Sequence, residues 1–271
     1  MKQQAKRTAR KDQTSSTNIP SNLLPTSHSG KAQRINRILS LAGLTSRRKA
    51  DEWLKSGRVK VNGRLVTELG TRAFWGSDSI MVDGREIPKP SPRLYLMLNK
   101  PFGYVCSLSD PEGRRLVTEL LSGITQRVYP MGRLDFDSLG LLLFTNDGEC
   151  AYRFTHPRYQ VPRTYKVTIA GKISDEVISL LRRGVQLEDG PSGRSKTTLI
   201  TRDEKHSIIR MTITQGKSRQ VRRMLETVGY SVVHLMRIGF GKLKLGDLKV
   251  GEYRFLEKEE VETMKRTVGL I

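Results

Sequence analysis

Between residues 32 and 91 the apolar positions recur first with the period of a helix and then with the period of a strand. In the first segment the apolar residues lie on one face of a helix: Ile35, Ile38, Leu39 and Ala42. In the next segment they again share one helical face: Ala50, Trp53 and Leu54. Gly43 is expected to end the first helix, and Thr45 or Ser46 to cap the second. The sequence therefore predicts two short helices between residues 35 and 56.

A small sheet is expected to follow. Val59 and Val61 alternate with basic residues, which is typical of a half-buried strand. Asn62-Gly63 is a strong signal for a tight hairpin turn. A further strand is predicted over residues 79–82. The proline-rich segment 88–92 predicts a stiff, extended connector.

Runs of strands dominate the remainder of the chain. Strands are predicted over residues 94–98, 140–145, 164–169, 207–213 and 231–238. Helices are predicted over residues 117–121, 175–183 and 218–228. Because strands and helices do not alternate regularly, we expect an α+β fold with a mixed or antiparallel sheet rather than a doubly wound parallel one. The expected organisation is a disordered basic tail (1–31), a small domain with its linker (32–91) and a larger domain (92–271).

Charge narrows the choice of partners. The chain of 271 residues carries a formal net charge of +21, which favours a polyanion, either nucleic acid or an anionic membrane surface. Residues 1–31 contain six basic residues and one acidic residue. They are expected to form either an RNA-attracting arm or a plain solvated tail.

Several classes of protein are disfavoured. The sequence has no apolar run long enough to cross a bilayer and no secretory signal, so we expect a cytoplasmic protein. The two cysteines, Cys106 and Cys150, are too few for a zinc knuckle or a disulfide framework. Glycine-rich nucleotide loops are absent, which weakens a methyltransferase interpretation. No amphipathic basic helix supports a membrane-surface role.

The N-terminal pattern resembles the S4-type RNA-binding domain. The resemblance rests on the order of helix, cap, basic turn, second helix and Val-Asn-Gly hairpin within residues 33–63. It implies that Arg47, Arg48 and Lys49, at the start of the second helix, contact RNA phosphates. A solvated helix face is the alternative explanation of these three charges.

Two carboxylates precede the most apolar predicted strand. Residues 132–148 read GRLDFDSLGLLLFTNDG, with Asp135 and Asp137 in the turn before the strand. Taken alone, such a carboxylate serves as a nucleophile, a metal ligand or, most commonly, a turn former.

This stretch resembles the signature of the RsuA family of ribosomal RNA pseudouridine synthases. Further segments resemble the same family: residues 98–103 (LNKPFG), 163–167 (RTYKV), 215–224 (QGKSRQVRRM) and 243–254. The resemblance implies that the chain is an isomerase that needs no metal or organic cofactor. It also implies a monomer that acts on ribosomal RNA, and residues 184–190 (GVQLEDG) are most similar to the branch acting on large-subunit (23S) RNA.

The resemblance also implies residue roles. Asp135 is the expected catalytic aspartate, acting either on the anomeric carbon or on the 2′ proton. An ionised carboxylate in a dry pocket requires a nearby cation, for which Lys217 and Arg219 are the candidates; their alternative role is phosphate binding.

Three further residues complete the expected site. Tyr165 is expected to pack on the uracil ring and to accept the C5 proton, unless it is simply a core tyrosine. Arg133 is expected to fill the gap left by a flipped uridine, or to contact a phosphate. Arg222 is expected to face RNA. The main competing hypothesis is a non-catalytic RNA-binding factor in ribosome assembly, and 16S RNA or tRNA are alternative substrates.

Overall fold

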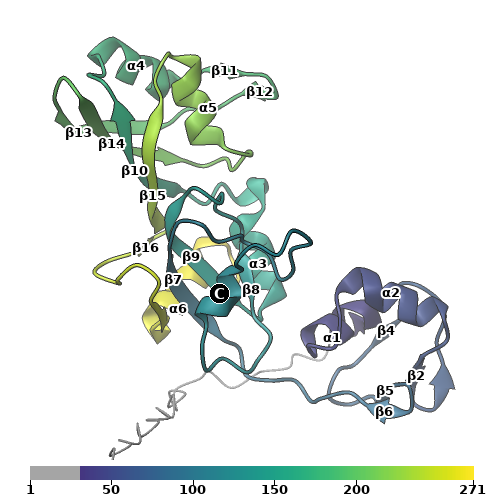
Figure 1. The fold of residues 1–271 in the computed structure, drawn as a ribbon. Helices are drawn as coiled ribbons and strands as arrows, with labels where there is room; N and C mark the ends of the chain where they lie inside the picture. The colour runs from purple at the N-terminus through teal and green to yellow at the C-terminus, as the bar shows by residue number, and fades with distance from the viewer. Residues whose placement is uncertain (1–30) are drawn as a thin grey trace, which may run out of the picture.

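The computed structural model describes residues 31–271, shown in Figure 1. The expectation of a disordered basic tail falls almost wholly on residues 1–30, which lie outside the described residues. Within the described part of the chain, no helix is long and apolar enough to cross a membrane.

Residues 31–87 form an N-terminal domain with its own core. The two predicted helices are present as α1 (Ile35–Leu41) and α2 (Arg47–Lys55). Gly43 has a positive φ of 82°, as expected of a residue that ends a helix, and the Ser46 side chain accepts a hydrogen bond from the Lys49 amide at 3.2 Å. Apolar residues of both helices and of the strands pack together in one buried cluster: Ile35, Ile38, Leu39, Ala50, Leu54, Val59, Ala73, Ile80 and Ile87.

The sheet of this domain has the strand order β3-β2-β5-β6. Its strands are β2 (Val59–Val61), β3 (Arg64–Leu65), β5 (Ile80–Val82) and β6 (Arg85–Glu86). Asn62 and Gly63 both have positive φ, which confirms the predicted hairpin turn. A separate pair, β1 (Gln33–Arg34) with β4 (Arg72–Ala73), was not predicted because two-residue strands leave no periodic signal.

A nine-stranded sheet forms the centre of the larger domain. Its main order is β13-β14-β10-β15-β9-β7-β17, with β16 on β15 and β8 on β9. The strands are β7 (Tyr95–Lys100), β8 (Tyr129–Met131), β9 (Leu139–Thr145), β10 (Arg163–Ala170), β13 (Lys196–Arg202), β14 (His206–Ile213), β15 (Val232–Phe240), β16 (Leu243–Lys244) and β17 (Tyr253–Phe255). All pairs are antiparallel except β9 with β15, so the expected mixed sheet is confirmed.

Helices cover both faces of this sheet. The helices are α3 (Gly148–Thr155), α4 (Asp175–Arg183), α5 (Gln220–Thr227) and α6 (Lys258–Thr267), with 3₁₀ turns at Val117–Leu120 and Pro157–Tyr159. Apolar residues of α4 and α5 belong to one core cluster, and those of α3 and α6 to the other. A short hairpin, β11 (Gln186–Leu187) and β12 (Gly190–Pro191), lies next to α5 (Figure 1).

The predicted strands and helices are all present, with small shifts at their ends and with the helix predicted over 117–121 present as a 3₁₀ turn. The helices α3 and α6 and the strand β13 are among the elements that were not predicted. Asp147 caps α3 by accepting hydrogen bonds from the amides of Glu149 and Cys150, both at 3.2 Å. The sequence Asn146-Asp147-Gly148 reads equally well as a loop, because the residues that cap helices also form turns. The same residues therefore mark both the end of β9 and the start of α3, and the sequence alone does not distinguish a loop from a helix here.

The two halves of the sheet meet at one close backbone contact. Parallel pairing of β9 with β15 involves only Leu139 with Met236 and Gly140 with Arg237. Gly140 has a φ of 101°, and a Cβ atom built there would lie 2.3 Å from the carbonyl oxygen of Arg237. Only glycine fits this position, for both backbone and steric reasons.

A buried ammonium group shapes the turn that leads into β9. The Lys100 side chain, at the end of β7, is fully buried. Its Nζ donates hydrogen bonds to the carbonyl oxygens of Ser138 (2.8 Å), Asp135 (3.1 Å) and Pro101 (3.1 Å). Burial lowers the pKa of Lys100. The Phe136 carbonyl oxygen lies 3.4 Å from the same Nζ. Four carbonyl groups thus surround the three donors of the ammonium, and the turn around Asp135 is tied to β7.

Gly140→Ala is expected to lower the free energy of unfolding by about 3–5 kcal/mol, because it combines a strained positive φ with a backbone clash. Gly171→Ala is the matched control: Gly171 has a φ of 81° but no atom within 4 Å of an added Cβ. The control should lose only about 1–2 kcal/mol. Urea unfolding measures both; equal losses would show that the backbone contact at Gly140 is not what matters.

Lys100→Met is expected to lower the free energy of unfolding by about 3 kcal/mol or more, because buried carbonyl groups lose their donors at about 1–3 kcal/mol each. Lys60→Met, at an exposed lysine of β2, should change it by less than about 0.5 kcal/mol. Urea unfolding of the two variants compares them directly. A small loss for Lys100→Met would mean that the turn is held by other contacts.

Candidate active site

A cleft of about 270 Å³ opens where the turn before β9 faces β10, β15 and the segment before α5. The four predicted catalytic residues line it together: Asp135, Tyr165, Lys217 and Arg219. Arg133 also lines it and is exposed. Segments from Gly132 to Phe240 thus contribute to one cavity, as the resemblance implied.

Asp135 presents a carboxylate without a partner among residues 31–271. Its backbone carbonyl accepts hydrogen bonds from Lys100 Nζ and from the Ser138 amide, both at 3.1 Å. The preceding amide, that of Leu134, donates to Cys106 Sγ at 3.3 Å. The backbone is therefore fixed on both sides, while neither side-chain oxygen is engaged in an ion pair or hydrogen bond in the described part of the chain.

Tyr165 lies on β10 and is 8% exposed. It pairs with Met211 of β14 on one side and Arg237 of β15 on the other, and the β10–β15 register shifts between Thr164 and Tyr165. The ring thus forms part of the core and part of the cleft wall. Its position is compatible with both predictions made from the sequence: a tyrosine of the hydrophobic core, and a ring that packs on the uracil of the substrate.

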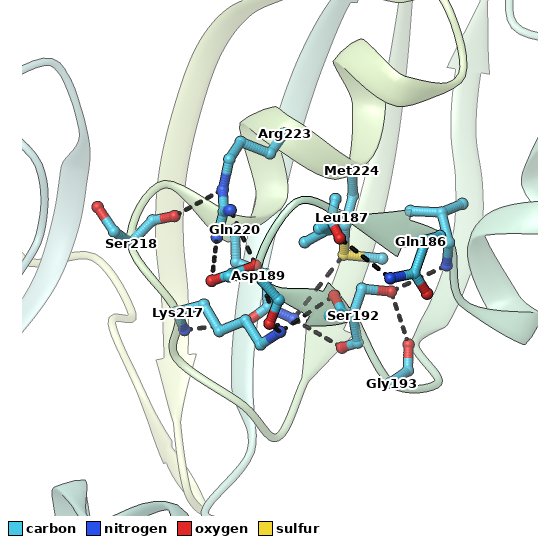
Figure 2. Close-up of polar contacts among 12 residues, drawn as sticks. Gln186, Leu187, Asp189, Ser192, Gly193, Lys217, Ser218, Gln220, Arg223 and Met224 are labelled. Atoms are coloured by element: carbon cyan, nitrogen blue, oxygen red, sulfur yellow. Dashed lines mark hydrogen bonds and ion pairs between the residues drawn. The ribbon is translucent and has the colours of Figure 1, made fainter.

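The Lys217 side chain is directed to the β11–β12 hairpin rather than to Asp135 (Figure 2). Its Nζ donates to the carbonyl oxygens of Asp189 (2.8 Å) and Gly190 (3.1 Å), and lies 3.3 Å from Asp189 Oδ1. Arg223 forms a two-point contact with the same carboxylate, at 2.9 and 3.1 Å. The hydrogen bonds from Arg223, then those from Lys217, hold the pKa of Asp189 below its usual value.

A buried glutamine joins this hairpin to the loop that carries Lys217. Gln220 is 3% exposed; its Nε2 donates to the Ser192 carbonyl at 2.8 Å, and its Oε1 accepts from the Lys217 amide at 3.1 Å (Figure 2). Ser192 Oγ in turn accepts from the Val185 amide. The buried Gln220 therefore fixes the backbone of Lys217, whereas the Lys217 ammonium is bound by the turn of the β11–β12 hairpin.

Arg219 and Arg222 both pair with Asp137, not with Asp135. Arg219 Nη1 lies 3.2 Å from each Asp137 carboxylate oxygen, and Arg222 Nη2 lies 3.2 Å from Oδ2 and donates to the Asp137 carbonyl at 3.1 Å. The Arg222 side chain is only 8% exposed and does not line the cleft. Where the sequence predicts that Arg222 faces RNA, the structure places its guanidinium in contacts within the protein. Likewise, neither Lys217 nor Arg219 pairs with Asp135 in this structure.

Two buried arginines also line the cleft: Arg163, expected from the sequence only to make the site more polar, and Arg237, which sequence reasoning missed. Arg163 donates to the carbonyl oxygens of Val161, Thr214 and Thr155, and its burial lowers its pKa. Arg237 is 1% exposed and donates from Nε to the Leu141 carbonyl at 2.7 Å.

The guanidinium groups of Arg163 and Arg237 both lie close to the Phe240 ring. Their guanidinium carbons lie 5.0 and 4.8 Å from the centre of the Phe240 ring. Nη2 of Arg237 has no hydrogen-bond partner in the described residues. An arginine in the middle of an apolar strand was the available signal, since such a residue is rarely buried without a reason.

The cleft is strongly cationic around one acid. Its charged lining consists of Asp135 and five basic residues: Arg133, Arg163, Lys217, Arg219 and Arg237. This field favours a polyanionic substrate. Among residues 31–271, no group of three or more His, Cys, Asp or Glu side chains is placed to hold a metal ion.

The N-terminal basic residues lie apart from this cleft. Arg47, Arg48 and Lys49 are exposed on the first turn of α2 and do not line it. Contact with RNA phosphates remains their predicted role.

Comparison with known proteins agrees with this geometry. The family described as RNA pseudouridylate synthase matches residues 94–227, and the S4 domain family matches residues 33–73. A ribosomal large subunit pseudouridine synthase B from Bacillus subtilis is 43% identical over 86% of this chain and 96% of its own length. An uncharacterised RNA pseudouridine synthase from Aquifex aeolicus is 40% identical over 88% and 95% of the two chains.

A crystal structure of a pseudouridylate synthase has the same fold. It superposes with a TM-score of 0.60 at 31% identity, covering 85% of this chain and 99% of the other. The expected fold class, an S4 domain followed by a larger domain with a mixed sheet, is confirmed. With its cationic cleft built around Asp135, the chain belongs to the RNA pseudouridine synthases, enzymes that isomerise uridine in RNA.

Proposed function

We propose that this enzyme converts a uridine of large-subunit ribosomal RNA into pseudouridine, with Asp135 as the catalytic residue. The observation that carries the proposal is the unpaired Asp135 carboxylate, held by its backbone at the floor of a cationic cleft beside Tyr165. The name of the Bacillus subtilis relative supports the large subunit as the source of the substrate. The protein would then act in the cytoplasm, and as a monomer, since one chain supplies the whole cleft.

The reaction can be assigned to these residues step by step. The bond between uracil N1 and ribose C1′ breaks, the base turns, and C5 bonds to the same C1′; the C5 proton leaves and N1 regains one. Asp135 either attacks C1′ or removes the 2′ proton, and Tyr165 accepts the C5 proton. Arg133, at the exposed rim of the cleft, occupies the space that the flipped uridine vacates.

Lys217 is proposed as the cation that stabilises the reacting centre. It lines the cleft, and its ammonium is held by carbonyl oxygens and a half-exposed carboxylate, contacts that exchange readily with an incoming ligand. Arg219 already neutralises Asp137 together with Arg222. A substrate that releases Lys217 from Asp189 would let it act on Asp135 or on the phosphate next to the target.

The test of the function is isomerisation of ribosomal RNA transcripts by the purified enzyme, mapped by carbodiimide modification and primer extension. The native enzyme should produce a stop at one uridine of the large-subunit transcript, and Asp135→Asn should reduce the rate at least about 10³-fold. Asp137→Asn is the control carboxylate; it should retain far more activity.

Each alternative outcome has a separate meaning. A stop in small-subunit RNA or tRNA alone would contradict the proposed substrate. RNA binding without any isomerisation would leave a binding role in ribosome assembly. An active Asp135→Asn would move the chemistry to another residue.

Lys217→Met is expected to lower kcat about 10²- to 10³-fold, the usual effect of removing one electrostatic group from a reacting centre. Arg219→Gln should lower it by less than about tenfold, because Arg222 still pairs with Asp137. Single-turnover rates at saturating enzyme compare the two variants. The reverse order would assign the catalytic cation to Arg219.

Asp189→Asn supplies the matching double-mutant cycle. If Asp189 acts only by holding Lys217, its substitution should have no further effect on kcat in the Lys217→Met background. Independent effects of the two substitutions would mean that Asp189 acts through Arg223 instead.

A further inference from the structure

A second and larger cleft lies between the N-terminal domain and the catalytic domain. Its volume is about 640 Å³, and it is separate from the catalytic cleft. A hydrogen bond from Arg127 Nη1 to the Thr45 carbonyl, 2.8 Å long, joins the two domains. In Figure 1 the N-terminal domain faces the α3 and β8 side of the catalytic domain.

One wall of this interdomain cleft is cationic. The N-terminal domain contributes Lys31, Arg34, Arg37, Arg47 and Arg72. Within residues 31–271, none of these five is in an ion pair with a carboxylate. The only acidic residue of the lining, Glu149, is already paired with Arg153 at 2.9 Å. The wall therefore fits a polyanion and lacks an internal counter-charge.

The opposite wall is formed by α3 and carries an exposed tyrosine. Tyr152 lines the cleft and is 53% exposed. Its ring centre lies 4.9 Å from that of His156, which lies 6.5 Å from Tyr159. A half-exposed aromatic ring supported from behind by a second ring is preorganised for stacking, because little side-chain freedom remains to be lost.

Helix α3 connects the two clefts. Gly148, Glu149 and Tyr152 line the interdomain cleft, and Thr155, at the other end of the helix, lines the catalytic cleft. Tyr152 and Thr155 are three residues apart, a rise of about 5 Å along a helix. A strand whose uridine occupies the catalytic cleft can therefore place a neighbouring nucleotide at Tyr152.

We propose that Tyr152 stacks on an unpaired base of the substrate RNA next to the target uridine, while Arg37 and Arg47 hold the adjoining phosphates. Aromatic rings beside a cationic groove are the usual means of binding single-stranded RNA. The inference rests on the proposed function, because it takes the same RNA as its ligand. It assigns to this cleft a role in substrate affinity that is separate from the chemistry at Asp135.

Binding to a short fluorescein-labelled oligouridine, measured by anisotropy over a range of salt concentrations, separates stacking from charge. Tyr152→Ala and Tyr152→Leu should each weaken binding about 5- to 100-fold without changing the salt dependence. Tyr152→Phe keeps the ring and should bind within about twofold of the native enzyme. Arg37→Gln should reduce the slope of log K against log salt by about 0.7, the contribution of one phosphate contact.

Turnover of the large-subunit transcript adds the functional readout. Tyr152→Ala should raise KM by a similar factor and leave kcat unchanged, as expected for loss of uniform binding. Native affinity and native KM in Tyr152→Ala would overturn the inference, and so would an equal loss in Tyr152→Phe. If the native enzyme binds RNA in this Tyr152-dependent way yet isomerises no uridine, the proposed function fails while the stacking site stands.

Discussion

The close approach of Gly140 to the backbone of Arg237 is the constraint on which the active site depends. It is the place where β9 and β15 pair, and through it the two halves of the nine-stranded sheet become one. Asp135 and Lys100 belong to the half that contains β7 and β9, whereas Tyr165 and Lys217 belong to the half built on β10, β14 and α5. Because the pairing extends over only two residues, a side chain at Gly140 would move Asp135 away from the other residues that line the cleft.

The distribution of charge pairs explains why Asp135 is left available. Two other carboxylates pair with two cations of the cleft and with two neighbouring arginines. Asp137 binds Arg219 and Arg222, and Asp189 binds Lys217 and Arg223. Lys100 approaches Asp135 only through the backbone carbonyl and leaves the side chain free. The protein thereby fixes the backbone of Asp135 while leaving its carboxylate free of ion pairs among residues 31–271.

The sequence was sufficient to predict that Asp135, Tyr165, Lys217 and Arg219 belong to one site, but not how they pair or that Arg237 lines the same cleft. The strands were predictable because apolar residues alternate along β10 and β14, and α4 because Ser174 caps an amphipathic segment. Contacts such as Arg219 with Asp137, 82 residues apart, depend on strand register and on the positive φ of Arg219 (47°), neither of which leaves a local pattern. The same holds for Lys217 and Asp189, and for the buried Arg237, whose carbonyl partner lies on another strand.

The two ends of helix α3 line two different clefts, one proposed to bind RNA and one proposed to contain the reaction. Capture of a long polyanion needs several weak phosphate contacts, which a cationic cleft beside the S4 domain supplies over a large area. Chemistry on one base needs a small cleft that excludes water and contains one unpaired carboxylate. Since α3 is a rigid element only eight residues long, it sets a fixed spacing between the two. On this proposal the spacing of the two clefts selects the substrate. A uridine is modified when its base enters the catalytic cleft while neighbouring nucleotides of the same RNA reach the interdomain cleft.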